Sequence, residues 1–170
     1  MALLDLSRVT KTLVKLIEES VKASPVWPAA QTLFVTGLPP DKLTGDNAVG
    51  VYLYHLAEEG TLRSQVWPGR PLAPPRFSPM ALNLYYVLSA HSDVEGTGAS
   101  YREQLLMGLA VKALHDYPTI DAATKIGGVS ILDPGLAEGD NTLRISLRLV
   151  PPNEAVSYWT AGSQPLRLSA

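Results

Sequence analysis

Three histidines are the residues best suited to acid–base chemistry, and one lies in a Ser-x-His-x-Asp run formed by Ser89, His91 and Asp93. These are the residue types of a nucleophilic triad. In a strand, however, alternate Cα atoms stand about 6.6 Å apart. A relay through a triad needs side chains within hydrogen-bonding reach, at about 3 Å. The spacing therefore favours a polar strand end over a catalytic site.

The other two histidines have structural explanations. His115 lies in the last turn of a predicted helix, where the helix dipole favours a cation, so we expect it to cap that helix. His55 lies in a strand predicted to be apolar on both faces, and we expect a hydrogen-bonded core histidine there. An enzyme that binds a small molecule would need a pocket with convergent titratable groups and is the less favoured alternative.

Three acidic residues and an asparagine between positions 133 and 141 lack the spacing of a metal site. Asp133, Glu138, Asp140 and Asn141 do not follow the D-x-[DN]-x-[DN]-G pattern of calcium loops, so a solvated turn is the simpler interpretation. The phosphate-binding pattern G-x-x-x-x-G-K-[ST] and the patterns G-x-G-x-x-G and G-x-S-x-G are absent. The chain has no cysteine, which excludes disulfides and cysteine-based zinc sites. The sequence predicts no catalytic residue, no cofactor and no metal.

Length and charge narrow the class of protein further. The 170 residues fit one domain, and a hydrophobic content of 46% is typical of a globular chain. The net charge of −2 argues against a nonspecific nucleic-acid binder, which would carry a basic surplus. No signal peptide is visible, and the densest apolar run, residues 105–111, is far shorter than the roughly 20 residues of a membrane span. We expect a cytoplasmic protein with no membrane partner.

Hydrophobic periodicity and turn residues predict the elements that must position these side chains. The order of elements predicts an α+β fold, with a mixed, mainly antiparallel sheet and about three helices packed on it. A doubly wound parallel fold ranks second. The predicted helices are 3–23, 100–117 and a short one ending near Gly162, and the predicted strands are 33–40, 49–56, 80–91, 129–132, 142–150 and 165–169.

Two of these elements carry specific expectations. In the strand 49–56, Val51, Leu53 and His55 share one face, and both faces are largely apolar, so we expect a central strand covered on both sides. Ser100 and Glu103 form an S-x-x-E capping box that is expected to begin the second helix.

Two segments have the composition of contact surfaces. The proline-rich stretch 61–79 is predicted to be a loop or arm, and long loops of this kind are either functional or plain surface. The C-terminal unit ends in an alternating strand whose backbone edge could accept another chain. The residues expected to make contacts are Trp67, Arg70, Arg76, Phe77, Arg144, Arg148, Trp159, Leu166, Arg167 and Leu168.

Four segments taken together resemble a known family, the tail terminator (cap) proteins of extracellular contractile injection systems and phage-tail-like particles. The segments are 47–63 (NAVGVYLYHLAEEGTLR), 81–90 (ALNLYYVLSA), 103–118 (EQLLMGLAVKALHDYP) and 154–169 (EAVSYWTAGSQPLRLS). The similarity covers nearly the whole chain in order. His91 departs from the family, which has an aromatic residue at that position, and the proline-rich stretch is variable.

This resemblance implies a structural protein rather than an enzyme. It implies one tail-terminator domain over residues 1–170 and a homo-oligomeric ring, expected to be a hexamer. The ring would close the distal end of the inner tube and sheath, end tube polymerisation and anchor the last sheath layer. It would assemble in the cytoplasm and then be part of the contractile particle. A phage tail-completion protein that contacts a neck is the alternative.

The resemblance also gives the terminal strand 165–169 a role, as a candidate for joining a neighbouring chain. Replacing Leu168 by proline is then expected to weaken assembly by removing a donor from the β ladder.

Overall fold

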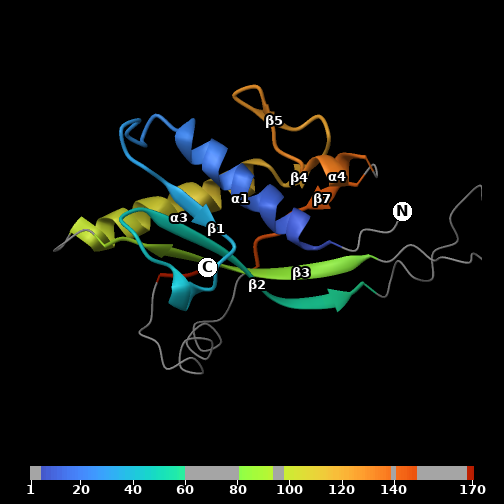
Figure 1. Cartoon of the computed structure of the whole chain (residues 1–170), viewed down its shortest axis with the longest axis horizontal. Coiled ribbons are helices and arrows are strands. Elements are labelled where there is room, and N and C mark those ends of the chain that lie inside the picture. The colour runs from blue at the N-terminus through green and yellow to red at the C-terminus, as the bar shows by residue number, and fades with distance from the viewer. Residues whose placement is uncertain (1–4, 60–80, 94–97, 139–140, 149–167) are drawn as a thin grey trace, which may run out of the picture.

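The computed structural model describes residues 5–59, 81–93, 98–138, 141–148 and 168–170 (Figure 1). Helices and strands of these residues form the predicted α+β fold, with a mixed, mainly antiparallel sheet. The helical elements are α1 (Ser7–Lys22), η1 (Pro40–Lys42, a 3-10 turn), α3 (Gly98–Asp116) and α4 (Pro134–Ala137). The strands are β1 (Phe34–Thr36), β2 (Ala48–Glu58), β3 (Leu82–His91), β4 (Thr119–Ile120), β5 (Lys125–Ile126), β6 (Val129–Ser130) and β7 (Leu143–Arg144).

Helix α1 forms because its apolar residues recur at three- and four-residue steps and so line one face. That face is buried, with Leu16, Ile17 and Val21 fully inaccessible to solvent. On the exposed face, the Lys22 ammonium lies 2.6 Å from the Glu18 carboxylate. The helix ends before Pro25, because a residue that precedes proline disfavours the helical conformation.

The central sheet has the strand order β1-β2-β3, with β1 parallel to β2 and β2 antiparallel to β3. Helices α1 and α3 pack against each other and on one face of this sheet (Figure 1). Val49, Val51 and Leu88 from that face join the helices in the main core. On the opposite face, the segment around η1 approaches the sheet at Gly50, where an added Cβ atom would lie 3.2 Å from the Leu38 carbonyl and 3.5 Å from the Leu43 side chain.

A β-bulge in β2 changes which side chains face the helices. Leu53 lies opposite Tyr86 and His55 lies opposite Tyr85, so Tyr54 is an extra residue in the ladder. The expected grouping of His55 with Leu53 on one buried face was therefore wrong. His55 is exposed and its ring lies 5.3 Å from that of Tyr85. The strand is central, but only its first four residues are buried.

The beginning of α3 also differs from the prediction. The helix starts at Gly98, so Ser100 lies within its first turn and is not its N-cap. The Glu103 carboxylate instead accepts a hydrogen bond from the amide of Ser92 at the end of β3 (3.2 Å). The expected capping box is replaced by a link between helix and sheet. At the other end, His115 lies in the last turn, as expected, and is exposed beside Asp116.

Short strands and α4 form a C-terminal unit beside α1 (Figure 1). Strand β4 pairs with β7, and β5 pairs with β6. Gly127 and Gly128 join β5 to β6 with φ angles of 56° and 84°, values that a two-residue hairpin turn with both central residues at positive φ requires. Of the predicted strand 142–150, the described residues 142–148 form a strand only at Leu143–Arg144, and Leu147 is 48% exposed.

Candidate assembly surfaces

The contact residues predicted from the sequence lie in different parts of the fold. Arg144 and Arg148 are exposed, and Arg144 lies on β7 opposite Thr119. Leu168 lies on a different sheet, beside β3. The structure therefore does not place these arginines and Leu168 on one strand face. Outside the described residues lie Trp67, Arg70, Arg76, Phe77, Trp159, Leu166 and Arg167, together with the predicted arm 61–79 and the short helix before Gly162.

The C-terminal residues 168–170 lie along the outer edge of β3 of the same chain, where Ser169 forms an isolated antiparallel bridge with Ser89 (Figure 1). The amide of Leu88 donates to the carbonyl of Ala170 (2.7 Å), and the amide of Ala170 donates to the carbonyl of Leu88 (3.1 Å). The amide of Ala90 donates to the carbonyl of Leu168 (3.2 Å). Ser89 and Ser169 face each other between these bonds, as a non-hydrogen-bonded antiparallel pair.

This geometry changes the reason to substitute Leu168. The ladder uses the carbonyl of Leu168, and the amide of the terminal segment that donates to β3 is that of Ala170. Proline at position 168 would therefore act by restricting the backbone rather than by deleting this ladder donor. A proline at position 170 would delete it.

The far half of the β2–β3 hairpin exposes apolar side chains. Tyr54 is 39% exposed and Leu56 is 49% exposed. Beyond the bulge, β2 continues as a two-stranded ribbon with β3, and Figure 1 shows this ribbon extending past the end of α1. Apolar surface of this kind is typical of protein contact sites. Period-two patterning does not predict this surface, because it assigns Tyr54 and Leu56 to a covered face.

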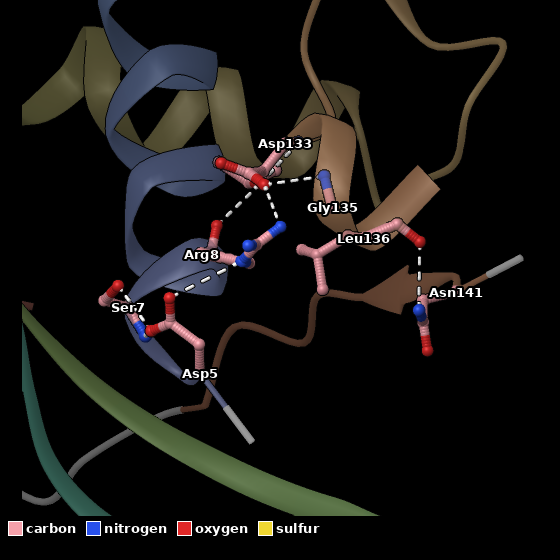
Figure 2. Close-up of polar contacts among 8 residues, drawn as sticks. Asp5, Ser7, Arg8, Asp133, Gly135, Leu136 and Asn141 are labelled. Carbon is pink, nitrogen blue, oxygen red and sulfur yellow. Dashed lines mark hydrogen bonds and ion pairs between the residues drawn. The ribbon is translucent and has the colours of Figure 1, made fainter. Parts of the chain in front are cut away.

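A polar contact joins the C-terminal unit to α1 (Figure 2). The Asp133 carboxylate accepts from the Arg8 guanidinium (3.3 Å) and from the amide of Gly135 (2.9 Å), so it also caps α4. The amide of Asp133 donates to the hydroxyl of Thr12 (3.1 Å). Asp133 and Asn141, considered above for a metal site, have structural roles instead, since the Asn141 side chain donates to the carbonyl of Leu136. This contact fixes the C-terminal unit on the helix that covers the sheet.

Replacing Asp133 by alanine is expected to lower the free energy of unfolding by about 1–2 kcal/mol, because it removes the N-cap of α4. Replacement by asparagine keeps a cap and removes the charge. It is expected to cost less than about 1 kcal/mol, because the partly exposed pair with Arg8 contributes little. Urea unfolding of the two variants measures both values. Equal losses in the two variants would contradict the assignment of the main effect to the cap.

The Ser89, His91 and Asp93 run does not assemble into a triad. His91 Nε2 lies 2.7 Å from Asp93 Oδ1, and His91 Nδ1 lies 3.6 Å from Glu103 Oε1. The Ser89 hydroxyl is buried and has no hydrogen-bond partner within the described residues. The His91 cluster ties the end of β3 to α3 and to the turn at Gly45, whose amide donates to Asp93 Oδ2 (2.7 Å). Its role is that of a polar strand end.

The hollow between α1 and β1 also lacks the groups of an active site. Its volume is about 380 Å³, and Lys11 is the one ionisable side chain among its lining residues. Nearby, Tyr86 on β3 shares a hydrogen bond with Thr10 (2.9 Å), and burial raises the pKa of the Tyr86 phenol. Among the described residues, no three acidic or histidine side chains are grouped to bind a metal. No described helix combines the length and apolarity needed to cross a bilayer.

Comparisons with known proteins give a family and a fold. The family model of the Pvc16 N-terminal domain matches residues 8–170. Among solved structures, the chain is similar to the sheath/tube terminator, in its extended state, of the extracellular contractile injection system PVC. That similarity has a TM-score of 0.57 and 17% identity, and it covers 99% of this chain and 54% of that one, so this chain spans about half its length. No curated protein matches the chain.

Proposed function

Because the chain belongs to the Pvc16 N-terminal domain family, as its four sequence segments indicated, we propose that it is the cap, or tail terminator, of a contractile injection system. Copies of the chain form a ring, expected to be a hexamer, on the distal end of the inner tube and sheath. The ring ends polymerisation of the tube and anchors the last sheath layer. The observation that carries the proposal is the family match over residues 8–170, and the terminator-like fold supports it.

The described surfaces suit a structural role. Exposed Tyr54 and Leu56 on the hairpin offer apolar area for contact with the tube, the sheath or another copy. The side chains considered for chemistry make structural contacts instead. His91 lies in the polar end of β3, and Asp133 caps α4. The protein assembles with its particle in the cytoplasm and remains part of it.

Deleting the gene and imaging the particles by negative-stain electron microscopy tests this role. Without the chain, tubes and sheaths are expected to vary widely in length or to lose their sheath. Re-expression of the wild-type chain is expected to restore a uniform length. Uniform, fully sheathed particles without the chain would contradict the proposal. A labelled chain found at a junction with a neck, rather than at a free end, would favour a tail-completion protein.

A further inference from the structure

We propose that, in the assembled ring, residues 168–170 of each copy pair with β3 of a neighbouring copy in place of their own β3. This inference rests on the proposed function, since it requires that copies of the chain lie side by side. It specifies which chain pairs with the outer edge of β3. That edge consists of the backbone groups of Leu88 and Ala90.

The outer edge of β3 requires a strand at this position. Leu88 is 4% exposed, and Ser89 and Ala90 are fully buried. The amides of Leu88 and Ala90 donate to the terminal segment. If that segment left without a replacement, two backbone donors would remain unpaired beside buried residues, which is unfavourable. The edge therefore holds a strand in every assembled state.

The contacts at this edge do not depend on which copy supplies the strand. Among the described residues they include three backbone hydrogen bonds and the facing pair Ser89 and Ser169. The same segment from an identical chain would make the same contacts. Exchange of an identical element between copies therefore loses no interaction at the edge itself, which is why exchanged strands are a low-cost route to oligomers.

The chain is long enough to allow exchange. Residues 149–167 connect Arg148 to Leu168. An extended chain spans at most about 3.3–3.6 Å per residue, so this connection can bridge up to roughly 60 Å. A compact domain of this size has a radius of gyration of about 15 Å. The terminal segment can therefore reach β3 of an adjacent copy.

Among the described residues, the rest of the outer edge of β3 is also unpaired. In a strand, the backbone N–H and C=O groups of every second residue point to the same edge. The backbone groups of Leu82, Leu84 and Tyr86 therefore point to the same outer edge of β3 as those of Leu88 and Ala90. These three outward groups have no backbone partner within the described residues. Natural edge strands are commonly protected by lysine, proline or a bulge. Strand β3 has no lysine or proline, and the bulge of this hairpin is in β2.

Cysteine cross-linking tests the exchange directly, because the natural chain has no cysteine. A non-hydrogen-bonded antiparallel pair has a Cα separation of about 4.5 Å, which is compatible with a disulfide. The double variant S89C/S169C is oxidised in the assembled ring, or in purified particles if the ring forms only there. Exchange predicts loss of the monomer band and a ladder of covalent oligomers on a non-reducing gel. A disulfide-bonded monomer as the main product would overturn the inference.

Mixed single variants provide the matched control. When S89C and S169C chains are combined in one ring, a disulfide between the two positions can form only between copies. Tyr101, which is 72% exposed on α3, supplies the collision control as Y101C. Exchange predicts far more cross-linking between S89C and S169C than between S89C and Y101C. Equal amounts would count against it.

If S89C does not fold, a photoreactive amino acid in place of the exposed Ala170 provides a second test, because it cross-links to the chain that lies beside it. In rings made from equal parts of ¹⁵N-labelled and unlabelled chains, exchange predicts cross-linked peptides of mixed label, whereas pairing within a chain predicts none. The outcomes also separate the two proposals. A ring with disulfides only within chains contradicts the exchange and leaves the cap function intact. Absence of the chain from the particles contradicts the cap function.

Discussion

Replacing Gly50 by alanine is expected to lower the free energy of unfolding by about 1–3 kcal/mol, the usual cost of adding a methyl group to a packed core. A Cβ atom at this position would lie 2.7 Å from the Ser89 hydroxyl and 3.2 Å from the backbone carbonyl of Leu38. The carbonyl cannot rotate away as a side chain can. At roughly 2–4 °C per kcal/mol for a chain of this size, thermal unfolding should report a lower melting temperature by several degrees.

Gly108 provides the matched control, because it is an exposed glycine in α3 where an added Cβ would meet no atom of another element within 4 Å. Alanine is expected to stabilise this position by about 0.5–1 kcal/mol, since glycine is a poor helix former. The two identical changes should thus have opposite signs. A shift of the melting temperature in the same direction for G50A and G108A would contradict this explanation. The close approach of β2 to the η1 segment would then not account for the effect of a side chain at Gly50.

A second substitution identifies the atom responsible. In S89A the buried hydroxyl that would meet the new methyl group is absent, and that hydroxyl has no hydrogen-bond partner among the described residues. S89A alone should therefore cost little, and G50A/S89A should recover part of the loss. Additive effects of the two changes would show that the Leu38 carbonyl carries most of the steric conflict.

Local patterns in the sequence predicted the regular elements well, because such patterns depend on residues a few positions apart. The three- and four-residue spacing gave α1 within a few residues of its observed ends, and the polar and apolar alternation gave β3. The order of the predicted elements indicated the α+β class, and the four segments indicated the family. The position of His115 in the last turn of α3 was also predicted from local spacing.

The errors concern features that depend on residues distant in the sequence. The bulge at Tyr54 is set by how β2 pairs with β3, and it moved His55 from an expected core position to the surface. Glu103 fits a capping box by spacing, but β3 offers the amide of Ser92 as a competing donor. Neither the pairing of β2 with β3 nor the competing amide of Ser92 can be inferred from a window of a few residues.

The contact surfaces show the same difference between features set by neighbouring residues and features set by residues distant in the sequence. The alternation near the C-terminus predicted a strand over 165–169, of which only 168 and 169 are described. The pairing of the C-terminal residues with Leu88 and Ala90 is long-range. The contact of Arg8 with Asp133 joins positions 125 residues apart, and nothing in the local sequence of either residue signals it. A sequence pattern can identify a strand that needs a partner, whereas the partner itself follows from the three-dimensional arrangement.

Leu16→Ala is expected to have the largest effect of these substitutions, a loss of about 2–5 kcal/mol in the free energy of unfolding. Leu16 is fully buried on the face of α1 that packs in the main core. Truncation removes buried apolar area and leaves a cavity, because packed neighbours relax only partly into the space. Since domains are stable by only about 5–15 kcal/mol, this loss is a large fraction of the total.

The same leucine-to-alanine change at Leu147 is the control, because this side chain is 48% exposed. L147A is expected to stay within about 0.5 kcal/mol of the wild type, as surface substitutions usually do. Urea unfolding should show a lower midpoint with an unchanged slope for L16A, since the surface exposed on unfolding is nearly the same. A lower slope would instead indicate that α1 separates from the sheet before the rest of the chain unfolds. Helix α1 also holds the C-terminal unit through Arg8, so that unit should then lose its protection from hydrogen exchange together with α1.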